Sequence, residues 1–211
     1  MSSKISLKSL EKKVFQRSFQ DGTIDIQIGC MFLMLAIAPN LSEYMGDFWA
    51  SAVFLPFFAA VYLILRSIKR KYIQPRIGVV EYGSYRKTRL KRMTLIMLVF
   101  NLAALLLGIF SFLNFSTTPG WMVAAFFSIL VLMGFSLAGY LLEFPRLYLY
   151  GVMTSLAFPV GEFLYSKYQV PHHGTPVTFG VVSGSIILTG IIILYRVLKV
   201  QPSSPQDGLH D

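Results

Sequence analysis

The feature that most constrains this chain is its longest stretch without charge. From Met93 to Leu142, fifty consecutive residues contain no Asp, Glu, Lys or Arg. A spanning helix needs about 20 apolar residues, because hydrocarbon offers no partner to unpaired backbone groups. The stretch is interrupted once, by the sequence STTPG at 116–120, which has the composition of a turn. We therefore predict two membrane-spanning helices, at 93–115 and 121–142, joined by a tight external hairpin.

Composition excludes other classes of protein. Hydrophobic residues make up 55% of the chain and charged residues 14%, whereas a soluble domain carries about 25% charged residues. A soluble globule of this size needs more polar residues to cover its surface. Intrinsic disorder requires low hydrophobicity, which this chain does not have. The sequence therefore predicts an all-α integral membrane protein.

Four further apolar segments complete a predicted bundle of six transmembrane helices within residues 23–200. The segment at 146–166 is the weakest of them, because Pro159, Gly161 and Glu162 cluster near its end. We nevertheless expect it to span the membrane. The other three predicted spans are at 24–41, 47–66 and 178–197.

The positions of Lys and Arg predict the orientation of the bundle. With both termini in the cytoplasm, eighteen of the nineteen Lys and Arg residues lie inside, and Lys167 alone lies outside. Cytoplasmic loops carry such an excess of positive charge. If 146–166 does not cross, the C-terminus moves outside and the split becomes seventeen to two, so apolar length, not charge, decides for six spans. We expect a multi-pass protein of a prokaryotic cytoplasmic membrane.

Both ends of the chain are expected to lie outside the bundle. Residues 1–22 combine lysines with apolar residues at near-helical spacing, which is typical of an amphipathic helix on the inner membrane surface. A basic tail held only by charge is the alternative. The segment 201–211 has the composition of a disordered cytoplasmic tail.

A basic cytoplasmic loop is predicted at 67–92. Ten cations fall between Arg66 and Arg92, against one acidic residue, Glu81. Such a loop can bind anionic lipid head groups, at about 1 kcal/mol per cation near the surface, or dock a partner protein. The plainer interpretation is that it only sets the orientation. Because these cations adjoin spans, we expect no nucleic-acid partner. The candidate binding residues here are Arg76, Arg86, Lys87, Arg89 and Arg92.

Acidic residues and histidines supply the remaining candidates. Asp21 and Asp25 are four residues apart, which places them on one helix face at the cytoplasmic edge, where ion pairs with nearby arginines are expected. The alternative is that this carboxylate pair binds a cation or relays protons. Glu162 lies within a predicted span, and ionisable groups there are functional hypotheses by default. His172 and His173 follow in the outer loop and are weak candidates for a metal site.

No cofactor is expected from the sequence. The single cysteine, Cys30, can form no intramolecular disulfide or cysteine-based metal site. No phosphate-binding loop, nucleophile elbow or haem-attachment motif occurs. Small residues four apart allow helices to pack closely. We expect them to pack spans within one chain, and the alternative is that they pack two chains together in an oligomer. These pairs are Ala104 with Gly108, Gly134 with Ala138, and Gly180 with Gly184.

Three functional hypotheses follow. The first is a small non-catalytic accessory or scaffold protein whose basic cytoplasmic face contacts anionic lipid or a partner. The second is a transporter or channel for a small solute or ion that uses Glu162, although the third and fourth predicted spans contain few polar residues. The third is an intramembrane enzyme acting on a lipid, which no spacing of nucleophile and base supports.

Overall fold

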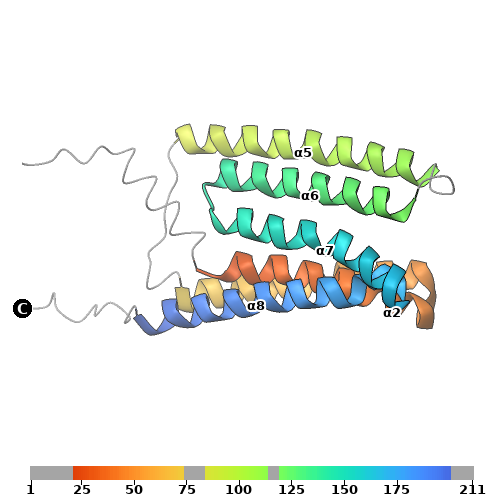
Figure 1. The fold of residues 1–211 in the computed structure, drawn as a ribbon. Coiled ribbons are helices and arrows are strands. Elements are labelled where there is room, and N and C mark those ends of the chain that lie inside the picture. Colours follow the sequence, from red (N-terminus) through yellow and green to blue (C-terminus); the bar gives the residue numbers. More distant parts are fainter. Residues whose placement is uncertain (1–20, 74–83, 114–118, 201–211) are drawn as a thin grey trace, which may run out of the picture. The chain divides into compact units, whose positions relative to one another are not determined.

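The computed structural model describes residues 21–73, 84–113 and 119–200. Within these ranges the chain is helical, with six α-helices and no strand (Figure 1). Four helical segments are long and apolar enough to cross a membrane, namely Thr23–Ala52, Gly120–Leu142, Arg146–Tyr168 and His172–Lys199. Large apolar side chains such as Leu98, Ile129 and Leu188 are about 60% exposed on these and neighbouring helices. Exposed apolar surface of this extent suits lipid rather than water, so the protein is a helical membrane protein.

Helix α2 (Thr23–Ala52) contains a sharp break. Gly46 has φ 81° and ψ 160°, a conformation that glycine adopts without the penalty of a Cβ. Ser42 and Asp47, on either side of the break, are joined by a hydrogen bond from the Ser42 hydroxyl to the Asp47 carboxylate. Residues 42–46, which we expect to separate two spans, therefore contain a break in the helix at Gly46, with helical backbone on either side of it.

Helix α3 (Phe54–Ile68) continues the second part of α2. Val53, between them, has helical dihedral angles. The Val53 amide donates to Trp49 O at 3.1 Å and the Phe57 amide donates to Val53 O at 3.2 Å. Pro56 has no amide hydrogen, which removes the bond that would otherwise reach Ala52. A single turn of π-helix, η1 (Lys69–Ile73), follows α3.

The chain divides into two compact units, which are described separately. Among the described residues, the first contains 21–34, 41–73 and 183–200, and the second contains 35–40, 84–113 and 119–182. In the second unit, α5 (Ser84–Leu113), α6 (Gly120–Leu142) and α7 (Arg146–Tyr168) lie side by side (Figure 1). A Cβ built on Gly134 would lie 2.9 Å from the Phe100 ring, and one on Gly151 would lie 2.6 Å from Phe135 Cβ. Small residues thus allow α6 to approach both of its neighbours.

In the first unit, the beginning of α2 crosses the second half of α8 (Thr175–Val200). A Cβ on Gly22 would lie 2.9 Å from the Leu194 amide nitrogen, and one on Gly190 would lie 2.8 Å from the Ile26 nitrogen. Gly29 meets Ile187 in the same way, with 3.0 Å from its built Cβ to the backbone nitrogen. The two backbones are therefore in contact at three glycines.

The pairs of small residues predicted from the sequence do not lie where α2 crosses α8. A Cβ added at Gly108, Gly180 or Gly184 would have no heavy atom within 4 Å in the part of the chain that the structure describes. The sequence prediction failed here because spacing identifies faces on which helices can approach, whereas the neighbouring helix decides which face is used. Of the glycines in the predicted pairs, Gly134 is the one in close contact with another helix.

Several predicted features lie outside the described residues. These are the amphipathic segment before residue 21, the tail from 201, and most of the hairpin at 116–120. The predicted loop at 67–92 is partly wrong, because α5 begins at Ser84 and η1 covers Lys69–Ile73. The sequence after Ser84 is rich in Arg and Lys, which are good helix formers. The prediction of a loop rests on the charge of these residues and leaves out their helical propensity.

Candidate functional site

Glu162 in the last turns of α7 pairs with His173 in the short 3₁₀ turn η3 (His172–Gly174). The distance from Glu162 Oε2 to His173 Nδ1 is 2.9 Å. The Glu162 side chain is 20% exposed and that of His173 is 53% exposed, so the pair is partly shielded from solvent. Lys167, the basic residue nearest in sequence, lies instead with Nζ 5.6 Å from the ring centres of Phe163 and Tyr168.

The carboxylate of Glu162 also lies at the beginning of α6. A Cβ built on Gly120, the first residue of that helix, would come within 3.0 Å of Glu162 Cδ. The first amide groups of a helix have no intrahelical acceptor and carry partial positive charge, which stabilises an anion there. Gly120 therefore does more than form a turn, since any larger residue would displace the carboxylate from the end of α6.

The turn that carries His173 has an uncommon backbone conformation. His172, His173 and Gly174 have φ values of 53°, 51° and 65°, all in the left-handed region. This region costs a residue other than glycine roughly 1–2 kcal/mol, and such residues cluster at functional sites. Gly161 of α7 fits directly against the turn, with its built Cβ 2.7 Å from His173 O. The Tyr165 ring lies beside the imidazole, with 4.2 Å between ring centres.

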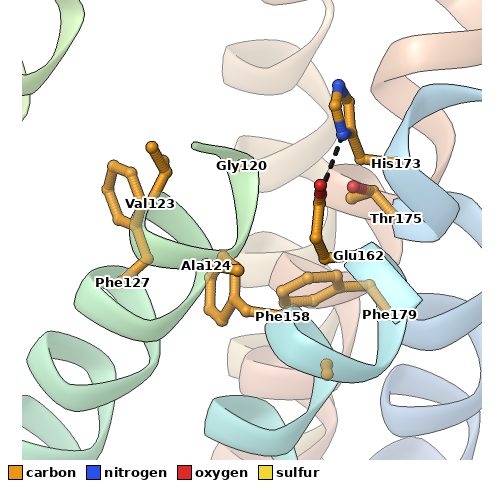
Figure 2. A pocket seen from close by; sticks show the side chains of 10 residues that line it. Gly120, Val123, Ala124, Phe127, Phe158, Glu162, His173, Thr175 and Phe179 are labelled. Atoms are coloured by element: carbon orange, nitrogen blue, oxygen red, sulfur yellow. Dashed lines mark hydrogen bonds and ion pairs between the residues drawn. The ribbon is translucent and has the colours of Figure 1, made fainter. Parts of the chain in front are cut away.

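A cavity of about 190 Å³ lies beside the Glu162–His173 pair (Figure 2). Its polar lining residues are Glu162, His173 and Thr175. Figure 2 shows the side chains of Glu162 and His173 pointing toward one another, with Phe158 and Phe179 below them in that view. The remaining lining is apolar and comes from α6, α7 and the start of α8: Gly120, Val123, Ala124, Phe127, Ala157, Phe158 and Phe179.

Three aromatic rings form a continuous wall of this cavity. Phe127 and Phe158 are stacked with 6.0 Å between ring centres and 20° between planes. Phe158 and Phe179 meet edge to face at 5.0 Å. The sequence does not mark these residues, or Thr175, as part of a site. Each phenylalanine lies within an apolar run of a different predicted helix, so no local pattern distinguishes it from an ordinary packing residue.

The histidine pair that we considered for a metal site is divided. His173 lines the cavity and contacts Glu162, whereas His172 is not among the lining residues. No group of three or more His, Cys, Asp or Glu side chains suited to a metal occurs among the described residues. Structural zinc sites use four protein ligands and catalytic ones three, so Glu162 and His173 alone are too few for either kind.

Asp21 and Asp25 are both buried, with 1% and 0% exposure. The prediction that they share a helix face is wrong, because α2 begins at Thr23 and Asp21 precedes it. Gly22 with φ 81° is the residue before the helix and turns the chain away from helical geometry. Asp21 Oδ1 accepts hydrogen bonds from the Thr23 amide at 3.1 Å and the Thr23 hydroxyl at 2.6 Å. Asp21 therefore accepts the hydrogen bond of the first amide group of α2.

The expected ion pair of Asp21 is formed with a lysine. Asp21 Oδ2 lies 2.7 Å from Lys69 Nζ, whose side chain is 32% exposed in η1. We expected an arginine from the chain before α2 or from the basic segment. Lys69 reaches this position because it follows α3 directly, at the first residue of the π-helical turn.

The basic candidates are only partly placed. Arg76 lies outside the described residues. The backbone positions of Arg86, Lys87, Arg89 and Arg92 belong to the first turns of α5. The structure therefore brings Glu162 and His173 together. Asp21 and Asp25 belong to the other compact unit. Four of the basic candidates are on one helix, α5.

Comparison with known proteins adds no relative to these observations. No protein-family model, curated protein or solved structure matches the chain.

Proposed function

We propose that this is a six-span, non-catalytic accessory protein of the membrane, with both termini in the cytoplasm, that binds anionic lipid through its basic segment. The observation that carries the proposal is the continuity of α5. Its basic first turns and its apolar remainder form one helix, Ser84–Leu113. Clusters of four to eight cations directly beside a spanning helix are typical of binding to anionic lipid head groups.

The register of α5 supports a position at the membrane surface. Positions 86, 87, 89, 91 and 92 are distributed around the whole circumference of a helix with 3.6 residues per turn. No side of these first turns is apolar enough to enter hydrocarbon, where each Lys or Arg costs about 2.5–3.5 kcal/mol on insertion scales. We infer that this part of α5 lies among the head groups and water while Thr94–Leu106, an apolar segment, enters the bilayer.

The six-span topology is supported by the bend in α2. Helical backbone extends from Asp47 through Val53 to Ile68, because hydrogen bonds cross the junction between α2 and α3. A helix rises 1.5 Å per residue, so a segment of this length can cross a bilayer after a turn at Gly46. Two spans then precede the basic segment and four follow it.

A lipid-binding measurement tests this proposal. The full chain is purified in detergent, and the phosphatidylglycerol that it retains is counted by native mass spectrometry. The variant R86Q/K87Q/R89Q/K91Q/R92Q should retain at least about tenfold less anionic lipid at equal concentration, because each cation near the surface contributes about 1 kcal/mol and tenfold corresponds to about 1.4 kcal/mol. A control neutralises cations of other helices, as R146Q/R196Q/K199Q, and should retain most of the lipid. Full retention by the first variant would contradict the proposal and leave the cations as an orientation signal.

The cavity beside Glu162 favours a second role, which is the binding or transport of a small solute. A half-buried carboxylate next to an open apolar volume is the arrangement expected at a ligand site. Flux into vesicles that contain the full chain, compared between the unmodified protein and E162Q, tests this role. Equal flux in both would remove Glu162 from any transport path.

A further inference from the structure

The cavity in the second unit joins two chemical environments. One end holds the Glu162 carboxylate with the His173 imidazole and the Thr175 hydroxyl, and the other is a wall of phenylalanine rings. No Lys or Arg is among the described residues that line it. A ligand that fits both ends has a polar head and an apolar body, and its head complements a carboxylate.

The volume limits the size of the body. A cavity of about 150 Å³ lined by apolar side chains can hold benzene. The volume here is about 190 Å³, which leaves room for one ring and a short chain but not for a large substrate. The phenylalanine faces also attract cations, by about 0.5–1 kcal/mol at exposed sites and more where water is excluded.

We propose that this cavity binds a small amphiphilic amine, a primary ammonium group on an apolar body of about the size of a phenyl ring with two carbons. The ammonium group lies against the Glu162 carboxylate, which His173 orients through the 2.9 Å contact to Oε2. The apolar body lies between Phe158, Phe179 and Phe127. The proposal deepens the second role above and rests on its cavity, but it holds whether or not the amine crosses the membrane.

A divalent metal ion is the main competing occupant. It would bind Glu162 and His173 alone among the described lining residues that ligate metals well, and its site would be walled by phenylalanine. The phenylalanine rings supply no ligand atoms that could replace the water bound to a metal ion. Their faces do attract an organic cation. The same ammonium chemistry occurs in free amines and in the head group of phosphatidylethanolamine, and the experiment separates these sources.

The chain supplies its own reporter for binding. It contains two tryptophans, and Trp121 is the neighbour of the lining residue Gly120. In the W49F background Trp121 is the single tryptophan, and its emission is excited separately from that of the tyrosines. The protein in phosphatidylcholine nanodiscs is titrated with 2-phenylethylamine and, in parallel, with 2-phenylethanol, which has nearly the same shape and no charge. Empty nanodiscs correct for partition into lipid. We expect the amine to bind at least about tenfold more tightly than the alcohol, equivalent to about 1.4 kcal/mol.

Variants assign the preference to the carboxylate. E162Q keeps the shape of the side chain and should abolish the tenfold preference without weakening the binding of 2-phenylethanol. E143Q, at the opposite end of α6, is the matched control and should bind both probes as the unmodified chain does. A124L narrows the cavity while it keeps Glu162 and should weaken both probes together. Thermal unfolding of each variant in the same nanodiscs shows that it is folded.

Each outcome decides the proposal. Equal binding of amine and alcohol, or an amine preference that survives E162Q, would overturn it. Displacement of the amine by Zn²⁺ with an affinity that depends on both Glu162 and His173 would assign the site to a metal instead. Repetition in nanodiscs that contain phosphatidylethanolamine identifies the source: competition assigns the lipid head group, and unchanged affinity assigns a free amine. Because binding is measured at equilibrium, absent flux would leave this result intact.

Discussion

Two carboxylates of this protein are held in different ways. Asp21 in the first unit is 1% exposed, and its two oxygens are engaged by Thr23 and Lys69. Glu162 in the second unit is 20% exposed, contacts His173 through one oxygen, and borders a cavity. Around Asp21 the backbones of α2 and α8 touch at glycines. Around Glu162 the helices are less closely packed and leave the cavity.

The difference separates a structural carboxylate from a candidate binding group. A buried charge is tolerated when nearby donors satisfy it, and Asp21 meets this condition with groups of the chain itself. Its burial therefore needs no ligand to explain it. Glu162 meets the condition only in part. The positive end of α6 and His173 stabilise its carboxylate, but one side of the carboxylate faces the cavity.

The close crossing of α2 and α8 should be the most sensitive point. Gly190→Ala places a methyl group 2.8 Å from the Ile26 nitrogen, and backbone atoms cannot rotate away. We expect it to lower the free energy of unfolding by about 3 kcal/mol, the upper range for an overpacked site. Gly184→Ala in the same helix has open space around it and should be neutral or slightly stabilising. Thermal unfolding in detergent measures both, and equal effects would show that the crossing is loosely packed.

Removal of Asp21 should have the next largest effect. Asp21→Ala removes two hydrogen bonds to Thr23 and the ion pair with Lys69. We expect a loss of about 2 kcal/mol in unfolding free energy, because hydrogen bonds to a charged group contribute about 1.5–3 kcal/mol. Asp21→Asn keeps the acceptor for Thr23 and should lose less.

A double-mutant cycle isolates the ion pair. Lys69→Gln alone and Asp21→Asn together with Lys69→Gln complete it. Because Lys69 is 32% exposed, solvent screens the pair, and we expect a coupling energy of about 1 kcal/mol. If the effects of the two substitutions simply add, the pair does not stabilise the fold and Asp21 acts through Thr23 alone.

Glu162→Gln should affect stability less than either substitution at Asp21. Its partner His173 is 53% exposed, and exposed pairs contribute about 0–1 kcal/mol. We expect less than about 1 kcal/mol in unfolding free energy, combined with the loss of amine preference described above. A loss of stability as large as that of Asp21→Ala, without any change in ligand binding, would make Glu162 a structural residue and remove the contrast.

Much of the helical organisation could be predicted from the sequence, because the signal is apolar length. The uncharged run between Met93 and Leu142 contains the observed helix Gly120–Leu142 and the apolar part of α5. The beginning of α5 could not be predicted in the same way, since charge and helical propensity point in opposite directions at 84–92. The break at Gly46 lies within residues 42–46, which the sequence predicts to separate two spans, although Gly46 itself, between Met45 and Asp47, carries no signal that distinguishes it from its neighbours.

The site was predictable in part. Glu162 stands out in sequence because it is an acidic residue within an apolar segment. Its contact with His173 depends on the left-handed turn at 172–174 and on Gly161, which together fold η3 back onto α7. The cavity depends on three phenylalanines from three helices. Such features arise from tertiary packing, and residues distant in sequence share no spacing that would reveal them.

The smallest predicted effect concerns the strained backbone next to this site. Gln169 ends α7 in the left-handed region with φ 55°, and its amide donates to Tyr165 O at 3.0 Å. Glycine is the usual residue at such a helix end because it has no Cβ. Gln169→Gly should therefore raise the unfolding free energy by about 0.5–1 kcal/mol, after allowance for the greater freedom of glycine in the unfolded chain.

The matched comparison for Gln169→Gly is the substitution His173→Gly. His173→Gly relieves the same kind of backbone strain, but it also removes the contact with Glu162, so we expect little or no gain in stability. Gln169→Ala, measured in the same thermal unfolding series, should not stabilise, because alanine retains the Cβ. If both glycine variants stabilised the protein equally, the Glu162–His173 contact would contribute nothing to the fold. The left-handed turn at 172–174 would then be maintained by Gly161 and Gly174, and the carboxylate would remain available to a ligand.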